Sequence, residues 1–414
     1  MKKSLKYIIL FLLIIALLSG TNLKKTSIKI YSENGGDILL RENKVEDFEY
    51  MFNIIKENYP FIEANKRIYG VDWLANKNKY IKKVESANSE EDFFYAMSDI
   101  LSDLHNDHTA MLSKENYIYL KRNYENLAKE DKKYNAWVRE LDRPATVNRY
   151  LSNTKDINDY EINKNNKLNH INIETDFMKD KNIAYIKINS FMPYSIEEDK
   201  SIIKIFLETI KEYEGLIIDI RGNSGGDIEY WQKEIVARII KEPITYVNYI
   251  AYKDGEYQRD FIDNYNRLKK IDKLSKKNLS NAPEDLNTEF KLFRKEEKRI
   301  KPKDSIKYDG DIFLLVDGEV YSAAEMFASF CKSTGFATVI GEITGGDGIG
   351  SDPVVCSLPN SGYIFTFSQE MGMSEDGKCN YEFRTSPDYV VNAKIEDLYD
   401  NDDAIQKVME IIGK

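Results

Sequence analysis

Apolar residues follow two different spacings along the chain, and the spacing changes near residue 180. In the first part they recur at intervals of three or four residues, the spacing of one helical face, at Phe48, Phe52, Ile55 and Tyr59. Ser89 is a predicted N-cap of a second helix, whose apolar face carries Phe93, Met97, Ile100, Leu101 and Leu104. Residues 44–112 are therefore predicted to form a helical N-terminal domain.

Beyond residue 180 the apolar positions indicate strands that alternate with helices. Residues 182–188 alternate in polarity, whereas 215–220 and 312–316 are continuous apolar runs typical of strands buried on both faces. A helix with an apolar face through Ile202, Ile205, Phe206 and Ile210 is expected between the first two strands. Strand, helix and strand in this order indicate parallel pairing and an α/β core.

Several segments around these elements have weaker patterns. Residues 22–43 form a short N-terminal segment, and 113–178 are interpreted as a connecting region with some helix. The core is expected to span residues 179–414, with further strands at 337–341 and 363–367, a hairpin that turns at Asp254 and Gly255, and a charged helical insertion at about 267–303.

The amino terminus has the pattern of a secretory signal. Lys2, Lys3 and Lys6 precede an apolar run at 7–18, and small residues follow up to Thr21. The run is too short to span a membrane comfortably, so residues 1–21 are predicted to be a signal peptide of an exported protein. A cleaved, soluble product is preferred, and an uncleaved membrane anchor is the alternative.

Composition narrows the possible functions. A net charge of −10 and a pI near 5.2 argue against a nucleic-acid binder, which would need a basic face. With three cysteines, at least one has no intramolecular partner; a disulfide between Cys356 and Cys379 is one alternative, and Cys331 is expected to be a buried thiol. No Cys/His spacing suits zinc, so no metal site is predicted.

Ser322 lies where the apolar run at 312–316 passes into a predicted helix. The first N–H groups of a helix have no intrahelical partner and can face a group that a serine hydroxyl attacks. Serine is also a common helix cap. The stretch alone therefore leaves two roles open for Ser322, cap or nucleophile.

A glycine-rich turn at 221–226 follows the buried strand at 215–220. Such a turn at the carboxyl end of a parallel strand can present backbone N–H groups to an oxyanion or a phosphate. No Gly-Lys-Ser/Thr follows it, so it fits no phosphate-loop fingerprint. A plain tight turn is the other interpretation.

Taken in order, residues 215–226, 310–328, 339–350 and 386–388 resemble the C-terminal processing and tricorn-core family of serine peptidases. The resemblance covers most of residues 182–395. Asp107-His108-Thr109 resembles the corresponding segment of the tricorn-like, histidine-dependent branch. This resemblance implies a crotonase-like or Clp-protease-like α/β core.

The resemblance also implies the site residues. Ser322 corresponds to the nucleophile, and the oxyanion donors would be the N–H groups of Ala323 and of Gly225, which is preferred over Gly226. The lysine base of the processing branch is replaced by Asp347, so the base is expected to be His108. Histidine suits this role because it exchanges a proton near neutral pH.

Glu382 is the expected partner that orients His108, with Asp388 and Glu375 as alternatives. Asp347 is then expected to be dispensable. The implied function is an exported serine endopeptidase that cleaves peptide or protein substrates through an acyl-enzyme, with no cofactor. The alternative is a non-catalytic protein that binds a peptide or an apolar ligand; a structure that holds Ser322 and His108 out of each other's reach would favour it.

Overall fold

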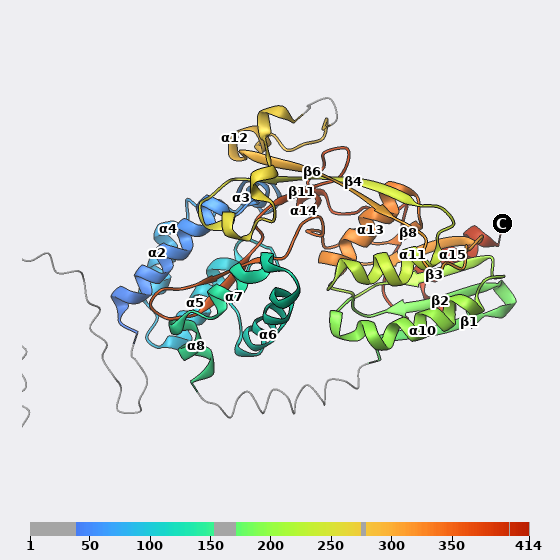
Figure 1. The fold of residues 1–414 in the computed structure, drawn as a ribbon, viewed down its shortest axis with the longest axis horizontal. Helices are drawn as coiled ribbons and strands as arrows, with labels where there is room; N and C mark the ends of the chain where they lie inside the picture. Colours follow the sequence, from blue (N-terminus) through green and yellow to red (C-terminus); the bar gives the residue numbers. More distant parts are fainter. Residues whose placement is uncertain (1–38, 153–170, 275–278, 397, 414) are drawn as a thin grey trace, which may run out of the picture. The chain divides into compact units, whose positions relative to one another are not determined.

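The computed structural model describes residues 39–152, 171–274, 279–396 and 398–413, and residues 41–414 form one structural unit. The predicted signal peptide at 1–21 and most of the segment at 22–43 lie outside the described residues. The elements of residues 41–414 are shown in Figure 1.

Helices make up the described chain before residue 153. They are α2 (Arg41–Asn58), α3 (Ile62–Tyr69), α4 (Lys77–Glu85), α5 (Glu90–Ser102), α6 (Lys114–Glu130), α7 (Asn135–Leu141) and α8 (Pro144–Leu151). Ser89 caps α5 in a capping box, because its hydroxyl accepts from the Asp92 N–H and the Asp92 side chain accepts from the Ser89 N–H. In the segment predicted as a connecting region with some helix, α6, α7 and α8 lie within 114–151, residues 153–170 are outside the described residues, and 173–178 form a strand.

A six-stranded sheet forms the core. Its strands are β1 (Ile173–Met178), β2 (Ile183–Ile188), β3 (Gly215–Asp219), β7 (Asp311–Val316), β8 (Thr338–Gly341) and β12 (Tyr389–Val390), and they pair in that order. β1 is antiparallel to β2 and all other pairs are parallel. The α/β core predicted from the buried apolar runs is confirmed.

Helices cover both faces of this sheet (Figure 1). One face packs against α10 (Ile196–Thr209), α13 (Ser322–Thr334) and a π-helical stretch (Tyr230–Val236) that continues into α11 (Ala237–Ile239). The other face packs against α15 (Asp403–Ile412). The predicted apolar face of α10 is confirmed at Phe206 and at Ile210, which follows the helix, since both are buried. It is wrong at Ile202 and Ile205, which are exposed.

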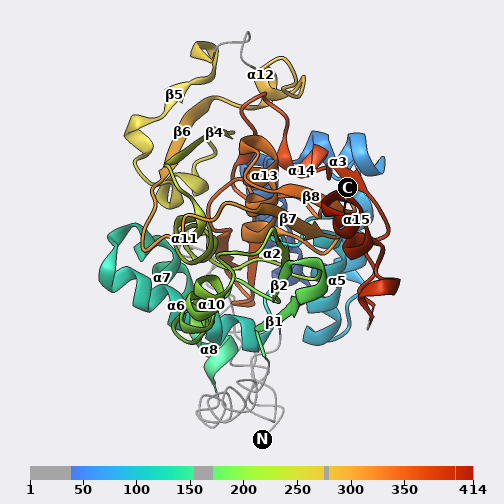
Figure 2. The same ribbon diagram turned by 90° about the vertical axis from the view of Figure 1, so that its right-hand side faces the viewer.

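A second sheet takes two of its strands from the predicted insertion at 267–303. Its strands pair in the order β11 (Met371–Met373), β4 (Ile244–Tyr252), β6 (Leu292–Ile300) and β5 (Lys269–Lys270), and Figure 2 shows β4, β5 and β6 away from β1 and β2. The helical prediction is wrong for β6, and the hairpin after Gly255 is not formed, because β4 pairs with β6. Between buried Phe293 and Ile300, β6 carries charged side chains that alternate between exposed and half-buried positions.

A small third sheet connects the N-terminal helices to the core. β9 (Val354–Ser357) and β10 (Ile364–Phe367) are antiparallel. The remaining α-helices of the described residues are α14 (Asn380–Phe383) and the short α12 (Leu286–Glu289). The Leu112 N–H donates to Ile364 O, and the Thr366 N–H donates to Ala110 O, each at 2.8 Å. The chain just after His108 is therefore tied to β10.

The three cysteines are free and buried. The disulfide considered between Cys356 and Cys379 is not formed, and burial raises the pKa of the Cys379 thiol to about 12. Within the described ranges, none of the helices combines the length and apolar character needed to cross a bilayer.

A buried arginine joins the sheet to α15. The Arg221 guanidinium lies 2.5 Å from the Asp219 carboxylate at the end of β3 and 2.9 Å from Asp402, and all three side chains are almost fully buried. Asp402 also accepts from the Ala404 and Ile405 N–H groups as the N-cap of α15. One cation therefore compensates two buried carboxylates from distant parts of the chain.

Replacing this cation should destabilise the fold strongly. Arg221→Leu would leave Asp219 and Asp402 buried without their counter-charge, which should lower the free energy of unfolding by about 3–5 kcal/mol. Lys233→Ala is the control, because it removes a pair to Glu229 in which both side chains are 56% exposed, and it should cost less than about 1 kcal/mol. Urea unfolding would measure both; equal stability of the two variants would contradict the prediction.

Candidate active site

Ser322 begins α13 in a backbone conformation that is uncommon for serine. Its φ is +55°, in the left-handed region, which costs on the order of 1–3 kcal/mol outside glycine and persists only where the surroundings enforce it. The Ser322 N–H donates to Gly346 O at 3.4 Å. On the opposite side, a Cβ on Gly225 would lie 2.8 Å from Ser322 Cβ, so only glycine fits there. Ser322 is therefore held between two glycine-containing loops.

His108 reaches Ser322 from the loop that follows α5. Its Nε2 lies 3.1 Å from Ser322 Oγ, and its ring packs against the Tyr321 ring with centroids 4.8 Å apart. The His108 side chain is 20% exposed. The structure thus brings together the two residues that the sequence predicted as nucleophile and base.

Asp347 occupies the other side of His108. His108 Nδ1 lies 2.9 Å from Asp347 Oδ2, and the same oxygen is within hydrogen-bond distance of Asn106 Nδ2 (2.8 Å), Ser368 Oγ (2.8 Å) and Tyr321 OH (3.2 Å). Burial alone would raise the pKa of this carboxyl, but the hydrogen bonds from His108, Asn106 and Ser368 and the charge of His108 hold it below its ordinary value.

This charge also determines the tautomer of the histidine. A carboxylate can only accept a hydrogen bond, so Nδ1 of His108 carries the proton that faces Asp347. In the neutral ring Nε2 then has a free lone pair, and it accepts from the Ser322 hydroxyl. The three side chains form a chain of hydrogen bonds that can move a proton from Ser322 to His108.

Glu382, predicted to orient His108, is not at this position. Its carboxylate accepts two hydrogen bonds from Arg67 of α3, at 2.8 and 2.7 Å. Of the alternatives, Asp388 accepts from the Val339 N–H and pairs with Lys332, and Glu375 is exposed. Asp347, which was expected to be dispensable, lies instead at the position beside His108 that was expected for Glu382.

The loop that carries Asp347 is packed directly on α13. A Cβ on Gly348 would lie 2.4 Å from Ser322 O and 2.5 Å from Met326 N, so a larger residue could not approach so closely. Glycines on both sides of Asp347 were the sequence signal of this contact. Asp347 was interpreted only as a residue that cannot serve as the lysine base. Its position beside His108 was therefore not predicted.

The predicted oxyanion donors differ in availability. The Ala323 N–H has no partner among the described residues, whereas those of Ala324 and Glu325 bond to Tyr321 O. The Gly225 N–H, the preferred second donor, is bonded to Asn223 Oδ1 at 2.9 Å. Within the described chain the Gly226 N–H makes no hydrogen bond, so availability does not favour Gly225 over Gly226 as the second donor.

Glu325 is a buried carboxyl one turn after Ser322. Its Oε1 accepts from Asn380 Nδ2 at 2.6 Å and from Thr385 Oγ1 at 2.7 Å. Burial raises the pKa of Glu325 to about 7, against the opposing hydrogen bonds of Thr344, Thr385 and Asn380 and the charge of Arg384. A group with this pKa changes charge in the neutral range.

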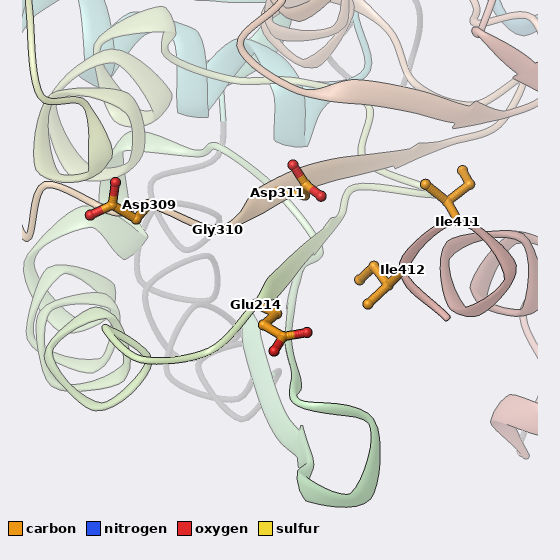
Figure 3. A pocket seen from close by; sticks show the side chains of 6 residues that line it. All are labelled: Glu214, Asp309, Gly310, Asp311, Ile411 and Ile412. Carbon is orange, nitrogen blue, oxygen red and sulfur yellow. The ribbon is translucent and has the colours of Figure 1, made fainter. Parts of the chain in front are cut away.

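A separate recess lies at the opposite end of the central strands of the sheet (Figure 3). It is lined by Glu214, Asp309, Gly310, Asp311, Ile411 and Ile412. Asp311 is the first residue of β7, and Glu214 directly precedes β3, so the recess lies at the amino ends of these two strands. Ser322 and the glycine-rich turn at 221–226 follow the carboxyl ends of the same strands. It is therefore not part of the candidate site.

Two family models match parts of the chain. The family model described as peptidase family S41 matches residues 182–391, about half of the chain, and the model of the tricorn protease C1 domain matches residues 40–102. No curated protein matches.

Solved structures share the fold at low sequence identity. A candidate peptidase from Parabacteroides merdae is 22% identical over 89% of this chain and 96% of its own, with a TM-score of 0.56. Mature CPAF is 12% identical over 90% of this chain and 96% of its own, with a TM-score of 0.54. The expected core fold is confirmed by these similarities.

The raised pKa of the buried Glu325 carboxyl predicts that the free energy of unfolding depends on pH. Its folded pKa of about 7 exceeds the ordinary 4.5, so its contribution to stability is complete below pH 4.5 and is lost as pH rises through about 7. Relative to Glu325→Gln, the wild-type free energy of unfolding should fall by on the order of 3 kcal/mol across this window. Urea unfolding at several pH values would measure it; parallel pH curves for the two proteins would contradict the prediction.

Proposed function

The chain belongs to peptidase family S41, and on this basis we propose that it hydrolyses peptide bonds through an acyl-enzyme formed on Ser322, with His108 and Asp347 completing a triad. The observation that carries the proposal is the continuous hydrogen-bond chain from Ser322 Oγ through His108 to Asp347, at 3.1 and 2.9 Å. Nucleophile, base and orienting acid are at the spacing that serine acyl transfer requires.

The proposed reaction follows from the proton positions. Ser322 Oγ attacks the substrate carbonyl carbon while its proton passes to His108 Nε2. The imidazolium is stabilised by the Asp347 carboxylate, and it then protonates the leaving amine as the peptide C–N bond breaks. Water, deprotonated by the same Nε2, attacks the acyl carbon, and the proton returns to Ser322 Oγ as the carboxylic acid product leaves.

The negative oxygen of the tetrahedral intermediate needs hydrogen-bond donors. The Ala323 N–H is the first candidate because it is free and adjacent to the nucleophile. The second is expected from the turn that contains Gly225 and Gly226, since a Cβ on Gly225 would lie 2.8 Å from Ser322 Cβ and 2.9 Å from Ala323 N. One such donor typically contributes about 3–4 kcal/mol to the stabilisation of the transition state.

The substrate class and location are part of the proposal. A peptide or protein substrate follows from the family, and endopeptidase action is our specific proposal. Export is supported by the basic, apolar and small-residue segments at 1–21. The alternative, a non-catalytic binding protein, called for Ser322 and His108 to be out of reach of each other, which the 3.1 Å separation does not favour.

Removing the nucleophile should abolish the reaction and leave the fold intact. Ser322→Ala deletes a single hydroxyl at a half-buried position, so the melting temperature should change little while casein hydrolysis and labelling by a fluorophosphonate probe are lost. Gel fluorescence and a protease assay would measure this. Labelling that survives in Ser322→Ala would show that another residue is the nucleophile.

Asp347 should be needed for catalysis and Glu382 should not. Asp347→Asn keeps the size of the side chain but removes the charge that selects the His108 tautomer, so kcat should fall by about 10³–10⁴-fold. Glu382→Gln is the matched control, because it makes the same change in a carboxylate that pairs with Arg67, and kcat should stay within about twofold. Steady-state kinetics would decide; a larger loss in Glu382→Gln than in Asp347→Asn would reverse the assignment.

A further inference from the structure

The short helix α14 contacts all the chain segments that carry the proposed triad. Tyr381 OH lies 3.0 Å from Leu104 O and 3.1 Å from His105 O, in the loop that carries His108, and its ring stacks on Phe61 with centroids 4.3 Å apart. The preceding residue, Asn380, contacts the other two segments. None of these contacts involves the reacting atoms, so α14 can act on the site only through its supports.

The Asn380 side chain joins the helix of Ser322 to the loop of Asp347. Its Nδ2 donates to Glu325 Oε1 at 2.6 Å, and its Oδ1 accepts from the Gly348 N–H at 2.7 Å and the Ile349 N–H at 3.2 Å. The amide can have only this orientation, because two backbone N–H groups point to one atom and a carboxyl oxygen to the other. Asn380 is 5% exposed, so water does not offer ready substitutes for these bonds.

The bonded groups are immediate neighbours of the triad residues. Gly348 follows Asp347, and Glu325 lies one helical turn after Ser322. A single amide therefore fixes the spacing between the segment that holds the acid and the segment that holds the nucleophile. His108 lies between the Asp347 and Ser322 side chains and is within hydrogen-bond distance of both.

We propose that Asn380 is a positioning residue, whose amide holds the Asp347 loop against the helix of Ser322 at the separation that His108 bridges. The proposal rests on the proposed acyl transfer at Ser322. Displacing a reacting group by about 1 Å can cost about 10²-fold in rate, so loss of this link should lower the rate of the chemical step more than the affinity for substrate.

The first test uses the rate at which a fluorophosphonate probe modifies Ser322. Asn380→Leu keeps the approximate volume but removes both hydrogen-bonding functions, so the maximal inactivation rate should fall by about 10–100-fold while the probe concentration at half-saturation stays within about threefold. The half-saturation term reports binding, and the maximal rate reports attack by Ser322.

A matched control separates positioning from loss of stability. Asn360 also donates from its amide to a buried carboxylate, Asp47 of α2, at 3.0 Å, but it lies in the turn between β9 and β10. Asn360→Leu should lower the melting temperature yet leave the maximal inactivation rate within about twofold of wild type, since the hydrogen bonds of this side chain to described residues go to α2. A comparable rate loss in both variants would overturn the proposal.

A second test replaces the Asn380 donor by an acceptor and does not depend on Asn380→Leu folding. Asn380→Asp keeps the acceptor for Gly348 and Ile349 but places a carboxylate against Glu325, with Arg384 as the nearby cation that acts on Glu325. At pH 6 the two carboxyl groups can share a proton, whereas at pH 8 they repel each other. The inactivation rate relative to wild type should therefore be at least about tenfold lower at pH 8 than at pH 6.

Adding Glu325→Gln to Asn380→Asp restores a hydrogen bond of opposite polarity, from the new amide to the new carboxylate. The double variant should recover to within about threefold of wild type at both pH values. A double variant no better than Asn380→Asp, or Asn380→Asp equal to wild type at both pH values, would overturn the role of Asn380.

The outcomes also separate this proposal from the proposed function. Wild-type protein that is not labelled at Ser322 would contradict the acyl-transfer function, and the positioning role would fall with it. Labelling that depends on Ser322 but not on Asn380 would leave the function in place and remove only the positioning role.

Discussion

The negative charge of Asp347 is the constraint on which the site depends. A carboxylate that is 8% exposed is strongly disfavoured unless hydrogen bonds replace its water. Here the donors come from separate parts of the fold: His108 and Asn106 after α5, Tyr321 before α13, and Ser368 after β10. Satisfying one charge therefore brings these segments together, and the arrangement of Ser322 against His108 is a result of that convergence.

The α/β core could be predicted because its signals are local. A strand buried on both faces must be apolar throughout, and residues 215–219 and 311–316 are nearly so. Where a helix connects two such strands, parallel pairing follows from the connection itself. Ser322 and His108 were found for a related reason, since each stands in a short segment with a recognisable pattern. The confirmed family resemblance added their order along the chain.

The third residue of the site could not be found in the same way. Whether Asp347 or Glu382 faces His108 depends on how closely the 344–350 loop packs on α13 and on which side of α14 meets Arg67. Both are long-range properties with no periodic pattern. The error in β6 has a similar cause. A run of charged residues shows no alternation of apolar and polar positions, and its side chains differ in burial only because β6 pairs with β4.

The charges of β6 have a consequence for solubility. β5 pairs with only Leu292 and Phe293, so most of the outer edge of the nine-residue β6 is not covered by β5. An open strand edge can pair with the same edge of another molecule and begin aggregation. The Arg, Lys and Glu side chains at 294–299 make such pairing costly. Each charged group would lose water and would face the side chains of a second, similarly charged strand. The charge run that obscured the strand in the sequence therefore disfavours edge-to-edge pairing of β6 with further copies.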